Sequence, residues 1–407
     1  MSEQVTCRAC GASELRPVLS LGRTPLANAC ITAEELDQPE PTYPLDVVFC
    51  PACTLVQITE TVPPEKLFGN YLYFSSFSDT MLAHARALTS ELIAARALGA
   101  GSLAVEIASN DGYLLRNYLE AGIAVLGIEP ARNIAAVAQQ RGVRTMCEFF
   151  NADLARRLRH EGYQADVLHA HNVLAHVADL HGVVAGIAEL LKADGVAIIE
   201  APYVKDLLDK VEFDTVYHEH LCYFSLTALT HLFARHGLTI VDAARIPIHG
   251  GSLRVTAGRE SRPSRAVAAL LAEEAGWGVD QPAVYLKFAR QVEALRDQIT
   301  STLRRLKAEG TTIAAYGASA KGATLLSYCG IGRETLDFVV DRSTAKQGRY
   351  TPGTHLPILA PEELLKAMPD YTLLLTWNFA DEILAQQQAY RDAGGRFIIP
   401  IPSVEIV

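Results

Sequence analysis

Four side chains that can handle protons stand in consecutive positions of the stretch VYHEHLCYFS: Tyr217, His218, Glu219 and His220. If this stretch curls into a turn, Tyr217 and His220 converge as an i, i+3 pair with Glu219 behind them. A histidine that is supported by a carboxylate and lies beside a phenol can act as a general base. The alternatives are a polar turn without chemistry and a zinc site built on the two histidines, which lacks an identifiable third ligand.

Another histidine follows a candidate strand. The apolar run ADVLHA predicts a buried strand, and HNVLAH continues from it with Asn172 and His176. Ligands of open α/β sheets bind at the carboxyl ends of the strands, so these two side chains are candidates for a site. His169 and His171, each taken alone, are interpreted as ordinary histidines at the end of a strand.

Cysteines form two Cys-x-x-Cys pairs near the start of the chain: Cys7 with Cys10, and Cys50 with Cys53. Repeated pairs of this kind in an intracellular chain predict a tetrahedral zinc site rather than two unrelated buried pairs, and a redox pair would need only one of them. Four thiolates leave no position open for water. We therefore expect this zinc to hold the fold and not to take part in the reaction.

The middle of the chain predicts a parallel nucleotide-type unit. SLAVEIASNDGYLL indicates a strand ending near Glu106, a tight loop and a helix, and the strand VLGIE then ends at Glu129. An acidic residue about 20 positions after the loop is typical of a residue that binds ribose hydroxyls. The loop has only Gly112 beside Asn110 and Asp111, without the glycine cradle for a pyrophosphate. S-adenosylmethionine is therefore favoured over a nicotinamide cofactor.

A second strand, glycine loop and helix follow in the last third of the chain. TIAAYGASAKG places Gly317, Ser319 and Lys321 at the start of a predicted helix. Lys321 is a candidate anchor for a diphosphate among free backbone amides, and a solvated lysine on a capping loop is the equal alternative. Before this unit, HGGSLRV predicts a glycine turn and a strand that presents Arg254.

Composition excludes several classes of protein. The chain has 407 residues, of which 49 % are hydrophobic and 20 % charged, and a formal charge of −10. Such a chain buries a large core but offers no broad basic surface for nucleic acid or an anionic membrane. The sequence contains no apolar run of about 18 residues, and its start does not have the pattern of a signal peptide. We expect a cytoplasmic protein, a monomer that binds neither nucleic acid nor membrane.

The alternation of elements predicts an α/β fold in three domains. The first, residues 1–75, is a zinc-binding domain. The second, residues 76–262, is a class I methyltransferase domain with a Rossmann-like sheet, and the third, residues 263–407, is a second Rossmann-like domain that helps to bind a nucleotide.

Taken together, these segments resemble one family along the whole chain: the three-domain C-methyltransferases that build methyl-branched deoxysugars on a thymidine diphosphate carrier. The matching segments are the paired Cys-x-x-Cys module, NYLYFSSFS, EIASNDGYLL, GIEP, HNVLAH, IIEAPY, YHEHLCYFSL, HGGSLRV, YGASAKG and TWNFADEI. Ala108 is a departure, because a glycine is expected in the cofactor loop.

The resemblance implies C-methylation at carbon 3 of a dTDP-linked 4-keto-deoxysugar. A base would remove the acidic proton of carbon 3, and the resulting enolate would attack the methyl group of S-adenosylmethionine. His220 is implied as the base with support from Glu219, Tyr217 being the alternative base. Tyr217 and His176 would stabilise the enolate or relay the proton, and Tyr71 would close the site.

The same resemblance implies two sets of binding residues. The methyl donor would contact residues around the middle unit: Glu106, Ser109, Asn110, Asp111, Glu129, Pro130 and Asn172. The sugar nucleotide would contact residues of the later segments: His249, Arg254, Ser319, Lys321 and Arg349.

Two other classes of function remain alternatives at this point. A nicotinamide-dependent oxidoreductase of nucleotide sugars would use the GASAKG unit and would oxidise or reduce a bound cofactor. A regulator that binds zinc and S-adenosylmethionine without catalysis would use YHEH only as structure. Mass spectrometry of sugar nucleotides incubated with the methyl donor separates the three.

Overall fold

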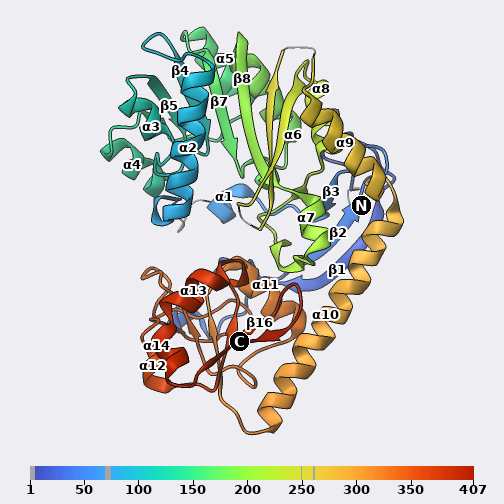
Figure 1. Cartoon of the computed structure of the whole chain (residues 1–407), viewed down its shortest axis with the longest axis vertical. Helices are drawn as coiled ribbons and strands as arrows, with labels where there is room; N and C mark the ends of the chain where they lie inside the picture. Colours follow the sequence, from blue (N-terminus) through green and yellow to red (C-terminus); the bar gives the residue numbers. More distant parts are fainter. Residues whose placement is uncertain (1–4, 69–74, 249, 260–261) are drawn as a thin grey trace.

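The chain folds into three sheets, and the first sheet lies between the part of the molecule with the central sheet and the part with the C-terminal sheet (Figure 1). The computed structural model describes residues 5–68, 75–248, 250–259 and 262–407. Among these residues, no helix is both long enough and apolar enough to cross a lipid bilayer.

The first sheet is antiparallel and contains one strand from a distant part of the chain. Its order is β1-β2-β3-β9, and Val56 of β3 pairs with Tyr223 of β9. The cysteine module is therefore joined by backbone hydrogen bonds to the strand that begins two residues after His220. The elements are β1 (Arg16–Thr24), η1 (Ala33–Glu35), β2 (Tyr43–Phe49), β3 (Val56–Ile58), α1 (Pro64–Phe68) and β9 (Cys222–Tyr223).

The central sheet has seven strands in the order β10-β11-β8-β7-β4-β5-β6. The strands from β8 to β6 are parallel, and β11 and β10 extend the sheet in antiparallel fashion. Its strands are β4 (Leu103–Ile107), β5 (Ala124–Ile128), β6 (Thr145–Met146), β7 (Ala165–His171), β8 (Leu191–Pro202), β10 (Thr239–Ile246) and β11 (Ser252–Gly258). The strands predicted above from SLAVE, VLGIE, ADVLHA and HGGSLRV are β4, β5, β7 and β11.

Helices cover both faces of the central sheet, because its strands alternate between two apolar sides. Ala104 of β4 packs into a core with α2, α3 and α4, whereas the neighbouring Val105 packs into the core that holds α5, α6 and α8. The helical elements are η2 (Ser75–Phe77), α2 (Asp79–Ala95), α3 (Leu115–Glu120), α4 (Arg132–Gln140), α5 (Ala152–His160), η3 (Leu174–His176), α6 (Leu180–Leu190), α7 (Val204–Asp209), η4 (Phe213–Thr215) and α8 (Leu226–Ala234).

The C-terminal sheet has the order β14-β13-β12-β15-β16-β17 and is parallel up to β16. Its elements are β12 (Ile313–Tyr316), α11 (Ala320–Cys329), β13 (Val339–Val340), β14 (Ile358–Leu359), α12 (Glu363–Ala367), β15 (Tyr371–Leu374), η5 (Trp377–Phe379), α13 (Ala380–Gln386), α14 (Gln388–Asp392), β16 (Arg396–Ile399) and β17 (Glu405–Ile406).

Two helices, α9 (Arg265–Trp277) and α10 (Pro282–Ala308), connect the central and C-terminal sheets along one side of the molecule (Figure 1). α10 begins with proline at its first turn, where the missing amide hydrogen costs nothing. Its 27 residues span about 40 Å. Residues such as Phe288, Val292 and Leu295 repeat at helical spacing and are buried, so this face packs against the rest of the chain.

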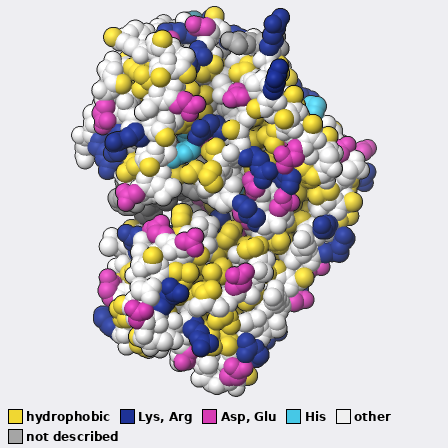
Figure 2. Space-filling view, in the orientation of Figure 1, with side chains coloured by type: hydrophobic (Ala, Val, Ile, Leu, Met, Phe, Trp, Pro, Cys, Tyr) yellow, Lys and Arg dark blue, Asp and Glu magenta, His cyan; other side chains and the backbone are white. Residues whose placement is uncertain are grey.

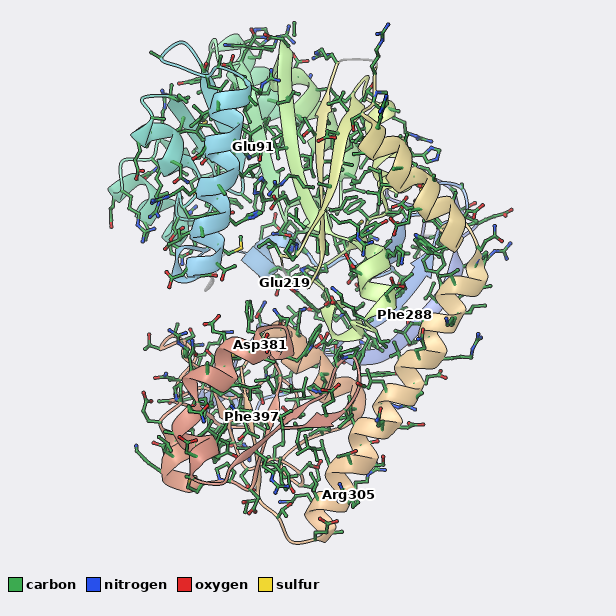
Figure 3. All side chains as sticks on the ribbon, in the orientation of Figure 1. Glu91, Glu219, Phe288, Arg305, Asp381 and Phe397 are labelled. Carbon is green, nitrogen blue, oxygen red and sulfur yellow. The ribbon has the colours of Figure 1, made fainter. Side chains whose placement is uncertain are left out.

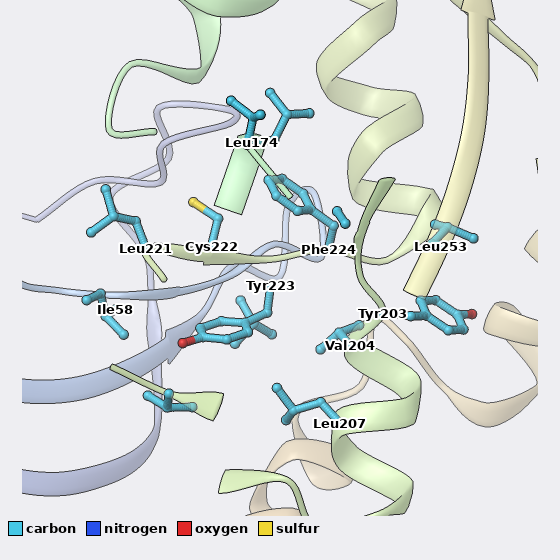
Figure 4. Close-up of a cluster of buried hydrophobic side chains, with 14 of the residues drawn as sticks. Ile58, Leu174, Tyr203, Val204, Leu207, Leu221, Cys222, Tyr223, Phe224 and Leu253 are labelled. Atoms are coloured by element: carbon cyan, nitrogen blue, oxygen red, sulfur yellow. The ribbon is translucent and has the colours of Figure 1, made fainter. Parts of the chain in front are cut away.

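A buried apolar cluster joins the first sheet, the central sheet and the segment after His220 (Figure 4). Tyr223 and Phe224 are each at most 1 % exposed and pack among Ile58, Leu174 and Leu207. Full burial of such a side chain contributes about 1.5–3 kcal/mol. This core fixes the segment that carries the candidate catalytic residues.

The surface is hollowed between the upper lobe, which holds the central sheet, and the lower lobe, which holds the C-terminal sheet (Figure 2). Glu219 lies at this space between the lobes (Figure 3). The candidate residues of the YHEH stretch are thus placed where the modules face one another.

Candidate active site

The YHEH stretch forms a turn that brings Tyr217 and His220 together. The Tyr217 hydroxyl lies 2.9 Å from His220 Nε2, and His220 Nδ1 lies 2.9 Å from the Thr215 carbonyl oxygen. A carbonyl only accepts, so Nδ1 of the neutral ring carries the hydrogen, and Nε2 accepts the phenolic hydrogen. This tautomer leaves Nε2 as the basic atom of the pair.

His176 is the third member of this cluster. It stands in η3, directly after β7, and its ring meets the His220 ring edge to face with centroids 4.8 Å apart. The Leu221 amide donates to the Ala175 carbonyl at 2.6 Å, which ties the two segments together. Burial lowers the pKa of His176 to about 4, although a backbone hydrogen bond at Glu219 opposes the shift. His176 is therefore neutral near pH 7.

Glu219 has a different partner from the one expected. Its Oε1 accepts a hydrogen bond of 2.6 Å from Asn28 Nδ2 in the first module, and the Thr215 carbonyl orients His220 instead. Glu219 is 4 % exposed, and burial raises its pKa to about 7 against the opposing effects of Asn28 and Lys346. The carboxyl group is therefore protonated in a large fraction of molecules near neutral pH.

This shift predicts the effect of Glu219→Gln on stability. The folded state binds the Glu219 proton up to about pH 7 and the unfolded chain only up to about 4.5, so wild-type stability falls as the pH rises between these values. Glutamine avoids this loss, because it is neutral at every pH. Above pH 7 the variant should be more stable by about 3 kcal/mol, since one pKa unit is about 1.4 kcal/mol.

Urea unfolding at pH 5 and pH 8 measures the difference. Glu161→Gln, at an exposed position, is the matched control and should show no gain at either pH. A gain for Glu219→Gln that is equal at both pH values would contradict the raised pKa.

The loop after β4 contributes to a cluster of buried polar groups at the carboxyl end of the central sheet. Ala108 and Asn110 both have positive φ, +51° and +49°, so the chain turns sharply here. Glycine is the usual residue for this conformation, and alanine holds it at a cost of about 1–2 kcal/mol. The departure from glycine therefore leaves the loop conformation intact.

Glu129 joins this polar cluster from the end of β5. Its Oε2 accepts the Asn110 amide at 2.9 Å, and its Oε1 accepts the Ala131 amide at 2.9 Å. Burial raises the pKa of Glu129, and these two bonds oppose the shift. A carboxylate offers about four lone-pair positions, so each oxygen keeps one for a ribose hydroxyl. Pro130, which follows Glu129, is half-buried.

Three further polar atoms of this cluster are buried and have no hydrogen-bond partner among the described residues: Glu106 Oε2, Ser109 Oγ and Asp111 Oδ1. Buried polar atoms in a folded protein are nearly always paired, so unpaired ones mark a place that a ligand or water completes. Asp111 also pairs with Arg141 at 2.7 Å. The donor set of hydroxyl and carboxyl groups without a glycine-rich phosphate cradle fits S-adenosylmethionine.

Replacement of Glu129 by alanine is expected to weaken S-adenosylmethionine binding by about 1.5–3 kcal/mol, the range for a hydrogen bond to a charged group. Titration calorimetry measures this, with Glu120→Ala at an exposed position as the control. Unchanged affinity for Glu129→Ala would remove Glu129 from the site. Tight binding of a nicotinamide cofactor instead would overturn the assignment of this polar cluster to S-adenosylmethionine.

A polar network that sequence reasoning missed crosses the neighbouring strands. The sheet register places His171 of β7 and Arg254 of β11 on either side of Glu200 in β8. Arg254 Nε donates to Glu200 Oε1 at 2.7 Å, and His84 Nε2 lies 3.0 Å from the same carboxylate. Burial raises the pKa of Glu200, but the histidines and Arg254 together bring it below its usual range. Arg254, expected to bind substrate, is thus paired within the sheet.

Asn172 lies where the expected site needs it, at the carboxyl end of β7. Its φ is +54°, and its amide donates to the Glu200 carbonyl at 2.7 Å. The backbone here turns away from the sheet, so the half-buried side chain stands at the strand end. Tyr71 and His249, also expected in the site, lie outside the described residues.

The four predicted cysteines converge at the base of the first module. Cys7 and Cys53 sulfurs lie 3.4 Å apart, Cys10 and Cys50 sulfurs 3.5 Å apart, and all four lie within 4.8 Å of one another. Four sulfurs around one tetrahedral zinc, each about 2.3 Å from it, have separations of this size. The residues therefore fit a structural zinc ion.

The C-terminal candidates have partners that differ from the expected diphosphate. Ser319 is the N-cap of α11, and its hydroxyl accepts the Gly322 amide at 3.0 Å. Lys321 Nζ is buried 4.8 Å from the centre of the Trp377 ring. Arg349 donates to the Cys30 carbonyl at 3.4 Å, where the first module meets the C-terminal domain. Of the three residues of the C-terminal domain that were expected to bind substrate, only Arg349 lies at the junction between the first module and the C-terminal domain.

Comparison with known proteins identifies the class first. A model described as "Methyltransferase domain" matches residues 81–243, "Putative zinc binding domain" matches residues 7–68, and "C-methyltransferase C-terminal domain" matches residues 247–402. The central sheet thus lies in a methyltransferase domain, and the four cysteines lie within the range of the zinc-binding model.

The relationship extends over the whole chain. Over 406 residues the chain is 39 % identical to C-methyltransferase NovU of Streptomyces niveus, which covers 98 % of this chain and 96 % of that protein. The chain therefore belongs to the C-methyltransferase family.

Two solved structures that match cover about half of this chain. Magnesium protoporphyrin IX methyltransferase of Synechocystis PCC 6803 with bound SAM is 16 % identical and covers 48 % of this chain and 89 % of that one, with a TM-score of 0.35. The PH0226 protein of Pyrococcus horikoshii OT3 is 14 % identical and covers 49 % of this chain and 100 % of that one, with a TM-score of 0.37.

Proposed function

We propose that the protein methylates carbon 3 of a dTDP-linked 4-keto-deoxysugar through an enolate. The observation that carries the proposal is the pair of Tyr217 and His220 beside neutral His176, at the carboxyl end of a methyltransferase sheet. Carbon acids next to a ketone need a base for the proton and a donor for the enolate oxygen. This cluster offers both.

His220 Nε2 takes the proton from carbon 3 in this proposal. In the structure Nε2 accepts the Tyr217 hydroxyl hydrogen. When the sugar is bound, that hydroxyl turns to the ketone oxygen and donates to it as the enolate forms, which frees Nε2 for the proton. The Thr215 carbonyl at Nδ1 stabilises the resulting imidazolium.

S-adenosylmethionine, when bound, supplies an electrophilic methyl group on a sulfonium. The chain's part is to hold the donor beside the sugar, with Glu129 at the ribose and Asn172 at the end of β7. The bond from carbon 3 to its hydrogen breaks, a bond from carbon 3 to the methyl carbon forms, and the bond from the methyl carbon to sulfur breaks. Its electron pair stays on the sulfur, and the demethylated donor leaves as a neutral thioether. The proton remains on His220 until it passes to solvent.

The nucleotide end of the substrate is proposed to lie between the first module and the C-terminal domain. Arg349 reaches the Cys30 carbonyl there, and Lys346 acts electrostatically on both Glu219 and Cys30. Two cations beside the sugar site suit a diphosphate. The proposed domain limits, residues 1–75, 76–262 and 263–407, place this site among all three domains.

The test is direct. Purified protein is incubated with S-adenosylmethionine and a panel of dTDP-4-keto-deoxysugars, and products are weighed by mass spectrometry. A gain of one methyl group on a 4-keto sugar, with loss of the deuterium when that sugar is deuterated at carbon 3, supports the proposal. The corresponding 4-hydroxy sugar should gain no methyl group. Oxidation of a reduced nicotinamide, or binding of the donor without turnover on any sugar, would contradict it.

A further inference from the structure

The C-terminal sheet has the crevice at which nucleotide-type sheets bind ligands. From β12 the chain moves outward to β13 and β14 and then returns to β15 on the other side of β12. Such a change of direction opens a crevice at the carboxyl ends of the two central strands. Gly317 follows β12 and Trp377 follows β15, so both lie at this crevice.

A carboxyl group from the central part of the chain is bound at this end of the C-terminal sheet. Trp377 Nε1 donates a buried hydrogen bond of 2.7 Å to Asp214 Oδ2 in η4, which belongs to the central part of the chain. A β-carbon added at Gly317, whose φ is +97°, would lie 2.5 Å from Thr376 Cγ2, so the crevice is also narrow at its base. The residues around it are packed against η4.

Lys321 completes this contact. Its ammonium lies over the same indole ring that binds Asp214, 4.8 Å from the ring centre. Burial raises the pKa of both Glu212 and Asp214, and Lys321 opposes the shift in each case, so its charge acts on the two carboxyl groups. A buried cation is stable only when such charges compensate it.

η4 is the element that orients His220. Asp214 is followed by Thr215, whose carbonyl accepts His220 Nδ1 at 2.9 Å and the Tyr223 hydroxyl at 3.5 Å. We propose that Trp377 and Lys321 are positioning residues of the C-terminal domain, which hold η4 through Asp214 and so fix the ring and tautomer of His220. The expected effect on turnover rests on the proposed function, in which His220 is the base. The expected effect on the tautomer of His220 does not depend on the proposed function.

The experiment uses the two tryptophans of the chain as a matched pair. Trp377→Phe removes the indole N–H but keeps a ring for Lys321, and Trp277→Phe removes an indole N–H that has no partner among the described residues. Protein labelled with ¹⁵N-histidine reports the tautomer of His220 by NMR, the signal being assigned from His220→Asn. Kinetics with the accepted keto sugar give kcat and KM.

We expect Trp377→Phe to turn the single His220 tautomer into a mixture and to lower kcat by about 10–10²-fold, as small displacements of a catalytic group do. KM should stay within about threefold, and Trp277→Phe should match the wild type. Lys321→Met should have the same effect in weaker form, and it replaces Trp377→Phe as the deciding variant if that protein does not fold.

Two results would overturn the inference. One is a His220 tautomer and a kcat that are unchanged in folded Trp377→Phe and Lys321→Met. The other is a KM for Lys321→Met that rises tenfold or more with kcat and tautomer unchanged, which would return Lys321 to a role as substrate anchor. If no keto sugar is turned over by the wild type, the proposed function fails, and the NMR comparison alone decides the positioning role.

Discussion

Replacement of His220 by asparagine is expected to lower turnover by about 10²–10⁴-fold, the usual contribution of a positioned general base. Asparagine keeps a polar side chain of similar reach and can still donate to the Thr215 carbonyl, so binding of both substrates should be preserved. The loss then belongs to proton removal. His231→Asn, at an exposed position of α8, is the matched control and should retain wild-type turnover.

The direct measurement is exchange of the carbon-3 hydrogen with deuterated water. It is run with the demethylated product of the donor, so that methyl transfer cannot intervene. His220→Asn should abolish the exchange, and Glu219→Gln should reduce it less, because Glu219 bonds to Asn28 and not to the His220 ring. Exchange that persists in His220→Asn and disappears in Tyr217→Phe would move the role of base to Tyr217.

The second large effect is expected from Cys50→Ser. Structural zinc contributes about 10–16 kcal/mol of apparent binding energy in zinc-finger peptides, as much as or more than the stability of a typical domain. The variant should lose the metal and unfold its first module. Metal analysis of the wild type should give about one zinc per chain, and Cys147→Ser, at an exposed cysteine, should keep it.

The structure extends this prediction to activity. β3 of the cysteine module pairs with β9, which begins two residues after His220. Metal loss should therefore lower turnover as well as stability, although no cysteine touches the cluster of His176, Tyr217 and His220 through any contact described above. A Cys50→Ser protein that keeps full zinc would contradict the ligand set, and one that loses zinc but keeps full activity would contradict the coupling.

The features that sequence predicted are those set by local spacing. Paired Cys-x-x-Cys segments bring two thiols together within each turn, and i, i+3 spacing brings Tyr217 to His220. Glu129 follows from the length of one strand, loop and helix. Each of these depends on a few consecutive residues, so the pattern alone is sufficient to propose it.

The features that sequence did not predict depend on contacts between distant segments. Asn28 reaches Glu219 across 191 positions, and Trp377 reaches Asp214 across 163. The pairing of Arg254 with Glu200 requires the register of two antiparallel strands. The role of the Thr215 carbonyl could not be predicted from the sequence, because every residue has a carbonyl and no residue type indicates which one orients a histidine.

The pairing of β3 with β9, which is distant in sequence, also limits the order in which the nascent chain can fold. β9 leaves the ribosome roughly 160 residues after β3, which at about 5–20 residues per second is a delay of about 8–30 seconds. During that time the cysteine module can take up its metal, but the open side of β3 has no partner and can pair with another chain. We therefore expect the yield of folded protein to depend on translation rate and on early metal supply.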